Sequence, residues 1–213
     1  MTSLPALDAI AGRRATRTFD PGRPVGPEIL AEILRAATLA PSAFNLQPSR
    51  FLVVRSPRNR ARLMACAFGQ PKVGEAPVVV IVLGYLSPHI ADLDDIIKDM
   101  KARGLLDDDG AAAYRGRVAG SMAKRADPTL WATRSAMLAA GTLMIAAESL
   151  GVNSAPMEGF DAEEVRSAFG VPDDHAICCL VALGHAAEVK PFPGRLPLER
   201  ICFEEHFGQP WTG

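Results

Sequence analysis

Apolar residues recur every three or four positions in several segments of this chain, which is the spacing of one face of a helix. The first such segment begins at about Leu4, and its apolar face consists of Leu7, Ile10 and Ala11. Further helices are expected from Pro27 to a stop before Pro41, through Arg60, Leu63 and Met64, and over residues 162–169. Residues 89–126 alternate charged and apolar positions, and they predict exposed helices interrupted at Gly104, 107–110 and 116–120.

The longest helical candidate spans residues 128–150 and is apolar nearly all round. Gly151 is its expected C-cap, because glycine adopts the left-handed backbone of helix ends without strain. A helix of this kind is typical of the centre of a domain or of a subunit interface. Its longest apolar run, residues 136–147, is too short to span a bilayer, so no membrane partner is expected.

Four short runs predict strands, at residues 51–54, 78–83, 152–155 and 177–183. The run at 78–83 is continuously β-branched or aliphatic, which is typical of a strand buried on both faces. A few strands among many helices, with no linker between them, predict a single domain over residues 1–213. The expected fold class is α+β or α/β, with helices packed around one sheet.

The composition narrows the kind of protein. Lysine plus arginine number 23 and aspartate plus glutamate 24, and the resulting net charge of −1 argues against nucleic acid as a partner. The four cysteines, at positions 66, 178, 179 and 202, match neither a CxxC motif nor a disulfide framework, and the histidines and cysteines lack the spacing of a metal site. The first eleven residues lack the pattern of a signal peptide, so we expect a cytoplasmic globular protein.

Three arginines, Arg13, Arg14 and Arg17, lie at the end of the first predicted helix. Residues three and four apart share a helix face, so their like charges repel, and a bound anion would relieve the repulsion. The planar guanidinium suits a phosphate group in particular. The alternative is a solvated helix end whose arginines complement the helix dipole, and the cluster taken alone favours that alternative.

Two loops offer polar groups on constrained backbone. Pro41 and Pro48 fix an extended segment that presents Ser42, Asn45 and Gln47, although an ordinary helix-to-strand connection has the same composition. Residues 155–161 form a strand-to-helix turn whose backbone N–H groups can approach a ligand. In that turn, Asp161 is also the expected N-cap of the next helix, with Glu164 completing a capping box.

The order and spacing of these motifs resemble those of the FMN-dependent nitroreductase family. The segments that carry the resemblance are 13–19, 41–48, 69–77, 156–160, and the pair Gly184–His185 followed by 195–197. The resemblance as a whole covers about residues 4–200, almost the whole chain. The resemblance implies an α+β three-layer sandwich with a mixed central β-sheet flanked by helices. It also implies a homodimer with the flavin at the subunit interface.

The resemblance further implies which residues bind FMN. Arg13 and Arg17 would lie beside the phosphate, the ribityl chain or the pyrimidine edge, and Arg195 would bind the phosphate. Gln70 would bond the isoalloxazine ring, and a backbone N–H of the Glu158–Gly159 turn would lie near flavin N5. The complete set of implied cofactor-binding residues is Arg13, Arg14, Arg17, Pro41, Ser42, Ala43, Asn45, Gln70, Pro156, Met157, Glu158, Gly159, Gly184 and Arg195.

Three positions depart from the family's pattern. Ala15 stands where a hydroxyl residue is common, and Ser49 stands where tryptophan usually follows Gln-Pro. Pro193 falls near a position where many members carry a lysine, and Lys190 is a candidate substitute. These departures concern the phosphate contacts and the packing behind the site rather than the fold.

The function implied by the resemblance is hydride transfer from NAD(P)H through FMN to a small electron-poor acceptor, such as a nitroaromatic or a quinone, with ping-pong kinetics. Two alternatives stay open. One is another flavin reaction on the same fold, such as that of a dehydrogenase, a dehalogenase or a flavin-cleaving enzyme. The other is a flavin-binding protein without catalysis. The homodimer is also favoured by the apolar helix 128–150 and by Phe203, Phe207 and Trp211, which have no partner in their own segment.

Overall fold

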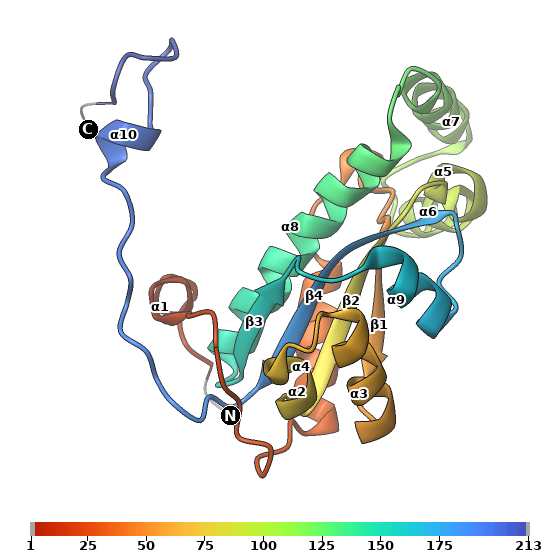
Figure 1. Ribbon diagram of the computed structural model, residues 1–213. Coiled ribbons are helices and arrows are strands. Elements are labelled where there is room, and N and C mark those ends of the chain that lie inside the picture. The colour runs from red at the N-terminus through yellow and green to blue at the C-terminus, as the bar shows by residue number, and fades with distance from the viewer. Residues whose placement is uncertain (1–2, 212–213) are drawn as a thin grey trace.

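The computed structural model describes residues 3–211 and shows an α+β fold in three layers (Figure 1). The central layer is a four-stranded sheet in the order β1–β2–β4–β3, formed by β1 (Ser49–Val54), β2 (Val78–Tyr85), β3 (Asn153–Met157) and β4 (His175–Gly184). The layers confirm the expected sandwich, but the expectation of a mixed sheet is wrong, because all three strand pairs are antiparallel. The segment that runs parallel to β3 makes only one isolated bridge, Ala15 to Ser154, and forms no strand.

Strand β2 is buried on both faces, as its unbroken apolar run predicts. Successive side chains point to opposite faces of a strand. Val79 and Ile81 therefore pack into the core on one side of the sheet. Val80 and Val82 pack into the core on the other side. Strand β4, the other central strand, divides its side chains between the two cores in the same way.

Two groups of helices cover the two faces of the sheet (Figure 1). One layer contains α2 (Pro27–Thr38) and α8 (Pro128–Ser149), and the other contains α3 (Pro57–Cys66), α4 (Pro71–Glu75) and α9 (Ala162–Phe169). Helix α1 (Ala6–Gly12) lies against the C-terminal end of α8, where the Leu4 N–H donates to the Ser149 carbonyl at 2.9 Å. The start of the chain is thereby placed next to β3.

Helix α8 packs against the sheet with Ala136, Ala140 and Leu143, all fully buried. It is also long and apolar enough to cross a membrane by length and composition, but its packing is that of a core helix. The helix ends at Ser149, one residue before the predicted end, so Leu150 rather than Gly151 is its C-cap, and Gly151 follows at a φ of +74°. Leu138, on the outer face, stays exposed.

A separate helical group extends the fold beyond one end of the sheet. It consists of α5 (Pro88–Ala91), α6 (Leu93–Ala102) and α7 (Asp108–Ala123), and it has its own core with Leu46 and Trp131. The expected interruption at 116–120 is wrong, because α7 continues through both glycines. Tyr114, Val118 and Met122 form a buried stripe at helical spacing, and this packing outweighs the cost of two glycines at about 1 kcal/mol each.

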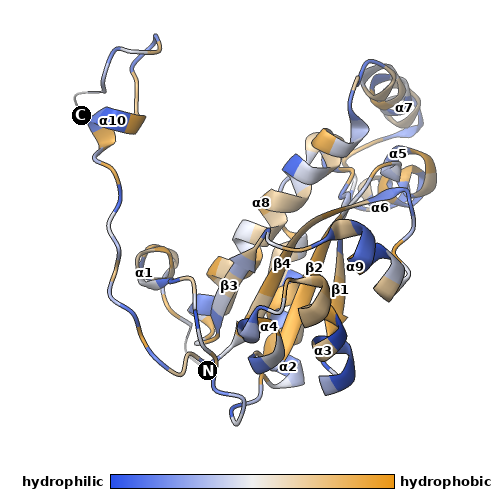
Figure 2. Cartoon of the chain, in the orientation of Figure 1, coloured by the Kyte–Doolittle hydropathy of each residue, from blue (hydrophilic) through white to orange (hydrophobic). Residues whose placement is uncertain are grey.

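Two apolar segments lie outside these cores. Helix α1 forms as predicted, but its apolar face points to solvent, since Leu7 is 78% and Ile10 53% exposed. The chain after β4 leaves the body as an extended arm that carries α10 (Leu198–Ile201) at its far end (Figure 1). Its Phe207 is 92% exposed. Figure 2 marks hydrophobic residues on both segments, and within residues 3–211 nothing covers them.

Candidate functional site

Residues 13–17 run along the open edge of β3. Ala15 bridges to Ser154, and the Thr16 N–H donates to the Ser154 carbonyl at 3.0 Å. Because β3 is an edge strand, this contact places Arg13, Arg14 and Arg17 at the side of the sheet rather than over it. The predicted arginine cluster is therefore held on a fixed strip of backbone.

Three of the predicted arginines surround one cavity. It has a volume of about 430 Å³ and lies between α1, α8 and the arm, with Arg13, Arg14 and Arg195 in its wall and no carboxylate among the residues that line it. Arg14 and Arg195 both stack on the Phe192 ring, at 4.6 and 5.0 Å from its centroid. Buried polar groups are ordinarily hydrogen-bonded, yet Nη1 of Arg13 is buried and has no partner in the described part of the chain.

Arg14 also interacts with the C-terminal end of α1, which is the structural role that the alternative interpretation gave to the arginine cluster. Its Nη1 donates to the carbonyls of Ala11, Gly12 and Arg13 at 2.7–3.0 Å, and it thus caps the C-terminal end of α1. Arg13 and Arg17 make no such capping bonds. The cluster therefore combines one helix-capping arginine with two whose guanidinium groups remain available to a ligand.

A second cavity, of about 170 Å³, lies on the other side of the same strip and is lined by Arg14, Ala15 and Arg17 together with residues at the start of the arm. Lys190 reaches this cavity, where its Nζ pairs with Glu188 at 2.5 Å. Part of the lysine's charge is neutralised by the glutamate.

The turn after β3 meets the predicted residue Gln70. Gln70 is the N-cap residue of α4, and its Nε2 donates to the Gly159 carbonyl at 2.6 Å. The structure therefore brings together two motifs that lie 89 positions apart. The backbone N–H groups of Glu158 and Gly159 donate no hydrogen bond within residues 3–211. Both N–H groups can therefore donate to a ligand.

The rest of this turn is fixed from both ends. The carboxylate of Asp161 accepts from the N–H groups of Glu163 and Glu164 at 2.9 and 3.0 Å, as the predicted N-cap does. The Asp161 N–H itself donates to the Cys66 carbonyl at the end of α3, and so the reciprocal half of the capping box is not formed. The Met157 side chain lies in the core, which leaves only its backbone for a cofactor.

Gly184 lies where β4 passes closest to neighbouring segments. A Cβ atom at this position would lie 2.7 Å from Pro77 Cδ and 2.8 Å from Phe19 Cδ1. We expect Gly184→Ala to lower the free energy of unfolding by about 1–3 kcal/mol, because neither neighbour can retreat without disturbing the core. Urea unfolding tests this prediction, and Gly116→Ala, with open space around its Cβ, is the control and is expected to stabilise the protein.

The loop with Pro41, Ser42, Ala43 and Asn45 does not join these residues within one chain. It precedes β1, and the sheet order puts β1 and β3 at opposite edges. It also enters β1 at Ser49, which pairs with Gly84, whereas Asn153 at the start of β3 pairs with Gly184 at the other end of β4. The predicted flavin-binding residues are therefore divided between two diagonally opposite corners of the sheet.

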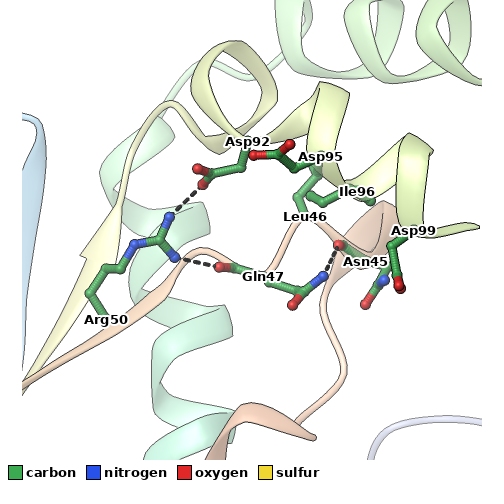
Figure 3. Close-up of a pocket in the computed structure, with 8 residues that line it drawn as sticks. All are labelled: Asn45, Leu46, Gln47, Arg50, Asp92, Asp95, Ile96 and Asp99. Carbon is green, nitrogen blue, oxygen red and sulfur yellow. Dashed lines mark hydrogen bonds and ion pairs between the residues drawn. The ribbon is translucent and has the colours of Figure 1, made fainter.

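At its own corner the loop faces α6 across a cavity of about 310 Å³ (Figure 3). Asn45, Gln47 and Arg50 line one side of the cavity, and Asp92, Asp95 and Asp99 line the other. Arg50 forms an ion pair with Asp92 across this gap. The loop is thus attached to the helical group of α5–α7 rather than to the arginines.

Sequence analysis did not single out Lys72, which the structure places close to Gln70. It lies on the first turn of α4 and is half-buried, and burial lowers the pKa of its amine because it disfavours the charged form. The sequence signal that could have pointed to Lys72 as a site residue is its position two residues after Gln70. Arg50 and Tyr114, which contact the 41–48 loop, were also missed. The Tyr114 contact joins residues 70 positions apart, which a single sequence does not indicate. Arg50 lies only three residues after Gln47, and no motif in the sequence marked it.

Comparisons with known proteins identify the family of this chain. The family model described as "Nitroreductase family" matches residues 10–185. A Thermus thermophilus protein named NADH dehydrogenase is 41% identical over 203 residues, which cover 93% of this chain and 97% of that protein. YodC of Bacillus subtilis, an NAD(P)H nitroreductase by name, is 29% identical over 92% of this chain and 96% of its own.

Solved structures show the same fold. A chain from Exiguobacterium sibiricum, solved in complex with FMN, superimposes with a TM-score of 0.89 and is 26% identical, covering 96% of this chain and 99% of that one. A nitroreductase-like protein from Streptococcus mutans superimposes with a TM-score of 0.86 at 25% identity, covering 94% and 98% of the two chains. On the family match, the relatives and the shared fold, this chain belongs to the nitroreductase family.

Proposed function

We propose that this protein is an FMN-dependent oxidoreductase that takes hydride from NAD(P)H and passes it to a small electron-poor acceptor, such as a nitroaromatic or a quinone. The observation that carries the proposal is Arg13, a half-buried residue that lines a cavity with Arg14 and Arg195 and whose Nη1 is buried without a partner in the described chain. An N–H group buried without an acceptor is costly, and an anionic ligand would supply the missing acceptor.

The residues at the β3 edge fit the phosphate end of FMN. A phosphate monoester carries between one and two negative charges near neutral pH and offers three strong acceptor oxygens. Arg13 and Arg195 would hold it, with Arg17 adjacent. Lys190 would add a donor in place of the lysine missing near Pro193.

The residues around the turn after β3 fit the flavin ring. Gln70 is already oriented by the Gly159 carbonyl, so its remaining amide atoms can bond a heterocycle edge. The free N–H groups of Glu158 and Gly159 would donate to the ring near N5. Lys72 would add positive charge nearby. When bound, FMN supplies the hydride chemistry, and the protein orients and polarises it.

The site is completed by a second subunit in this proposal. Ser42, Ala43 and Asn45 lie too far from the arginines to serve the same flavin, so the partner subunit's Ser42 and the partner's Asn45 would complete the site. Support comes from the exposed apolar residues of α1, the outer face of α8 and the arm. A two-fold homodimer covers such surfaces and gives two equal sites.

The visible spectrum of the purified protein tests the cofactor. We expect non-covalent FMN that is released on denaturation. A colourless preparation that also fails to bind added FMN would contradict the proposal. The cytoplasmic location stays a prediction.

Steady-state kinetics test the reaction. We expect parallel double-reciprocal plots for NAD(P)H and menadione, because one open flavin face has to receive the two substrates in turn. A control without acceptor should show only slow oxidation of NAD(P)H by oxygen. Intersecting plots would mean that both substrates bind together, which a single shared site does not allow.

A further inference from the structure

The loop before β1 has an unusual backbone. Phe44, Asn45 and Gln47 have φ values of +53°, +46° and +48°, although none of them is glycine. Residues with side chains seldom adopt this left-handed region, and a phenylalanine does so least readily. Three such residues within four positions keep this shape only where their surroundings hold them.

Two side chains bind the carbonyls of these residues, one from a distant helix and one from the strand that directly follows the loop. The Tyr114 hydroxyl, on α7, donates to the Phe44 carbonyl. Arg50 Nη1, on β1, donates to the Gln47 carbonyl at 2.8 Å (Figure 3). A third contact is local, since the Gln47 N–H donates to Ser42 Oγ at 2.9 Å. Donors from outside the loop therefore bind two of its three left-handed residues.

Both donors are themselves held firmly. Tyr114 is only 6% exposed, and its ring packs edge-on against Phe44 with the centroids 6.3 Å apart. Burial raises the pKa of its hydroxyl, so the hydroxyl keeps its proton at any physiological pH. Arg50 pairs with Asp92 at the start of α6 (Figure 3). Its guanidinium also lies 5.1 Å from the centroid of the Tyr85 ring.

We propose that Tyr114 and Arg50 are positioning residues that hold the 43–47 loop in its left-handed shape and thereby set the affinity of the flavin site that this loop completes. The second part rests on the proposed function. Neither side chain needs to touch FMN. They act by fixing where the loop presents Ser42 and Asn45, so that this geometry exists before the cofactor binds.

The first test concerns the loop alone and does not depend on FMN. In the apoprotein, we expect Tyr114→Phe to accelerate hydrogen exchange of the amides at 43–47 about tenfold, which is the effect of losing one buried hydrogen bond. The rest of β1 and β2 should exchange at the wild-type rate. Tyr85→Phe is the matched control, because it removes a hydroxyl that forms no hydrogen bond with any described residue, unlike the Tyr114 hydroxyl. Equal exchange in the two variants would overturn the positioning role of Tyr114.

The second test separates positioning from general support. Arg50→Met removes the bond to the Gln47 carbonyl and the ion pair, whereas Asp92→Asn removes only the ion pair. We expect Arg50→Met and Tyr114→Phe each to raise the FMN dissociation constant about tenfold, and Asp92→Asn to raise it less than about threefold. Arg50→Lys should recover part of the loss. Equal weakening by Asp92→Asn and Arg50→Met would show that Arg50 only secures α6, which would overturn its positioning role.

The outcomes also separate this inference from the proposed function. If wild-type protein binds no FMN, the proposed function fails, while the exchange rates still decide whether the two side chains hold the loop. If wild-type protein binds FMN and neither variant changes its affinity, the inference fails and the proposed function stands. Circular dichroism of each variant checks that it is folded.

Discussion

Arg13→Met is expected to weaken FMN binding by about 1.5–3 kcal/mol, or about ten- to a hundredfold, which is the usual contribution of a hydrogen bond to a charged group. The methionine keeps the aliphatic packing but removes the cation whose Nη1 is buried without a partner. Arg195→Met should have a similar effect, because Arg195 lies in the wall of the same cavity. Fluorescence titration of the apoproteins with FMN measures both losses.

The same substitution should affect the apoprotein in the opposite sense. A buried N–H group without an acceptor among the described residues costs stability, so the Arg13→Met apoprotein is expected to be at least as stable to heat as wild type. FMN should then stabilise it less than it stabilises wild type. Arg103→Met, at an exposed pair with Asp99, is the control for the loss of one positive charge. Unchanged FMN affinity in both Arg13→Met and Arg195→Met would place the phosphate elsewhere.

A chain that ends at Pro197 is expected to lose both its dimeric state and its flavin. It keeps Arg195 but lacks α10 and the apolar residues that follow, among them Phe203, Phe207 and Trp211. If each of these three side chains is buried against a second subunit, their loss removes several kcal/mol, at about 1.5–3 kcal/mol for each. We expect the dimer dissociation constant to rise by at least about a hundredfold.

Sedimentation with detection at 280 and 450 nm follows assembly and flavin together. Leu138→Glu, on the outer face of α8, should give the same result without shortening the chain. Leu105→Glu, in the turn between α6 and α7, is the control with an equally new charge on an exposed leucine. A shortened chain that remains dimeric and yellow would show that the arm does not hold the subunits together.

Elements with strong local signals were predicted well from the sequence. Helix α9 has the predicted bounds, because Asp161 caps its first turn and Gly170, at a φ of +63°, ends it. Helix α7 was predicted with a break, because the glycines are visible in the sequence while the buried stripe of Tyr114, Val118 and Met122 belongs to a core built from distant segments. Local propensity is outweighed there by tertiary packing.

The candidate site, too, was predicted only in part, because some of its contacts depend on tertiary structure. The resemblance implied that Gln70 and the 156–159 turn each contact the flavin, but it did not predict the hydrogen bond that the structure shows between Gln70 and the Gly159 carbonyl. The separation of the 41–48 loop from the arginines was not predicted from the sequence. It depends on the strand order β1–β2–β4–β3, which no local pattern specifies. The hydrogen bond from Tyr114 to the Phe44 carbonyl also joins distant parts of the chain, which no local pattern specifies.

The two corners of the sheet lie near opposite ends of α8, a helix of 22 residues and so about 33 Å long. In a two-fold dimer, each subunit would then lend its arginines to one site and its loop to the other. The protein would therefore show complementation between alleles. A subunit defective only in Arg13 and a subunit defective only in its loop would form mixed dimers in which one site carries both lesions and the other carries neither. With random pairing, about a quarter of all sites would be intact, and a cell that expresses the two defective genes together would regain activity that neither restores alone.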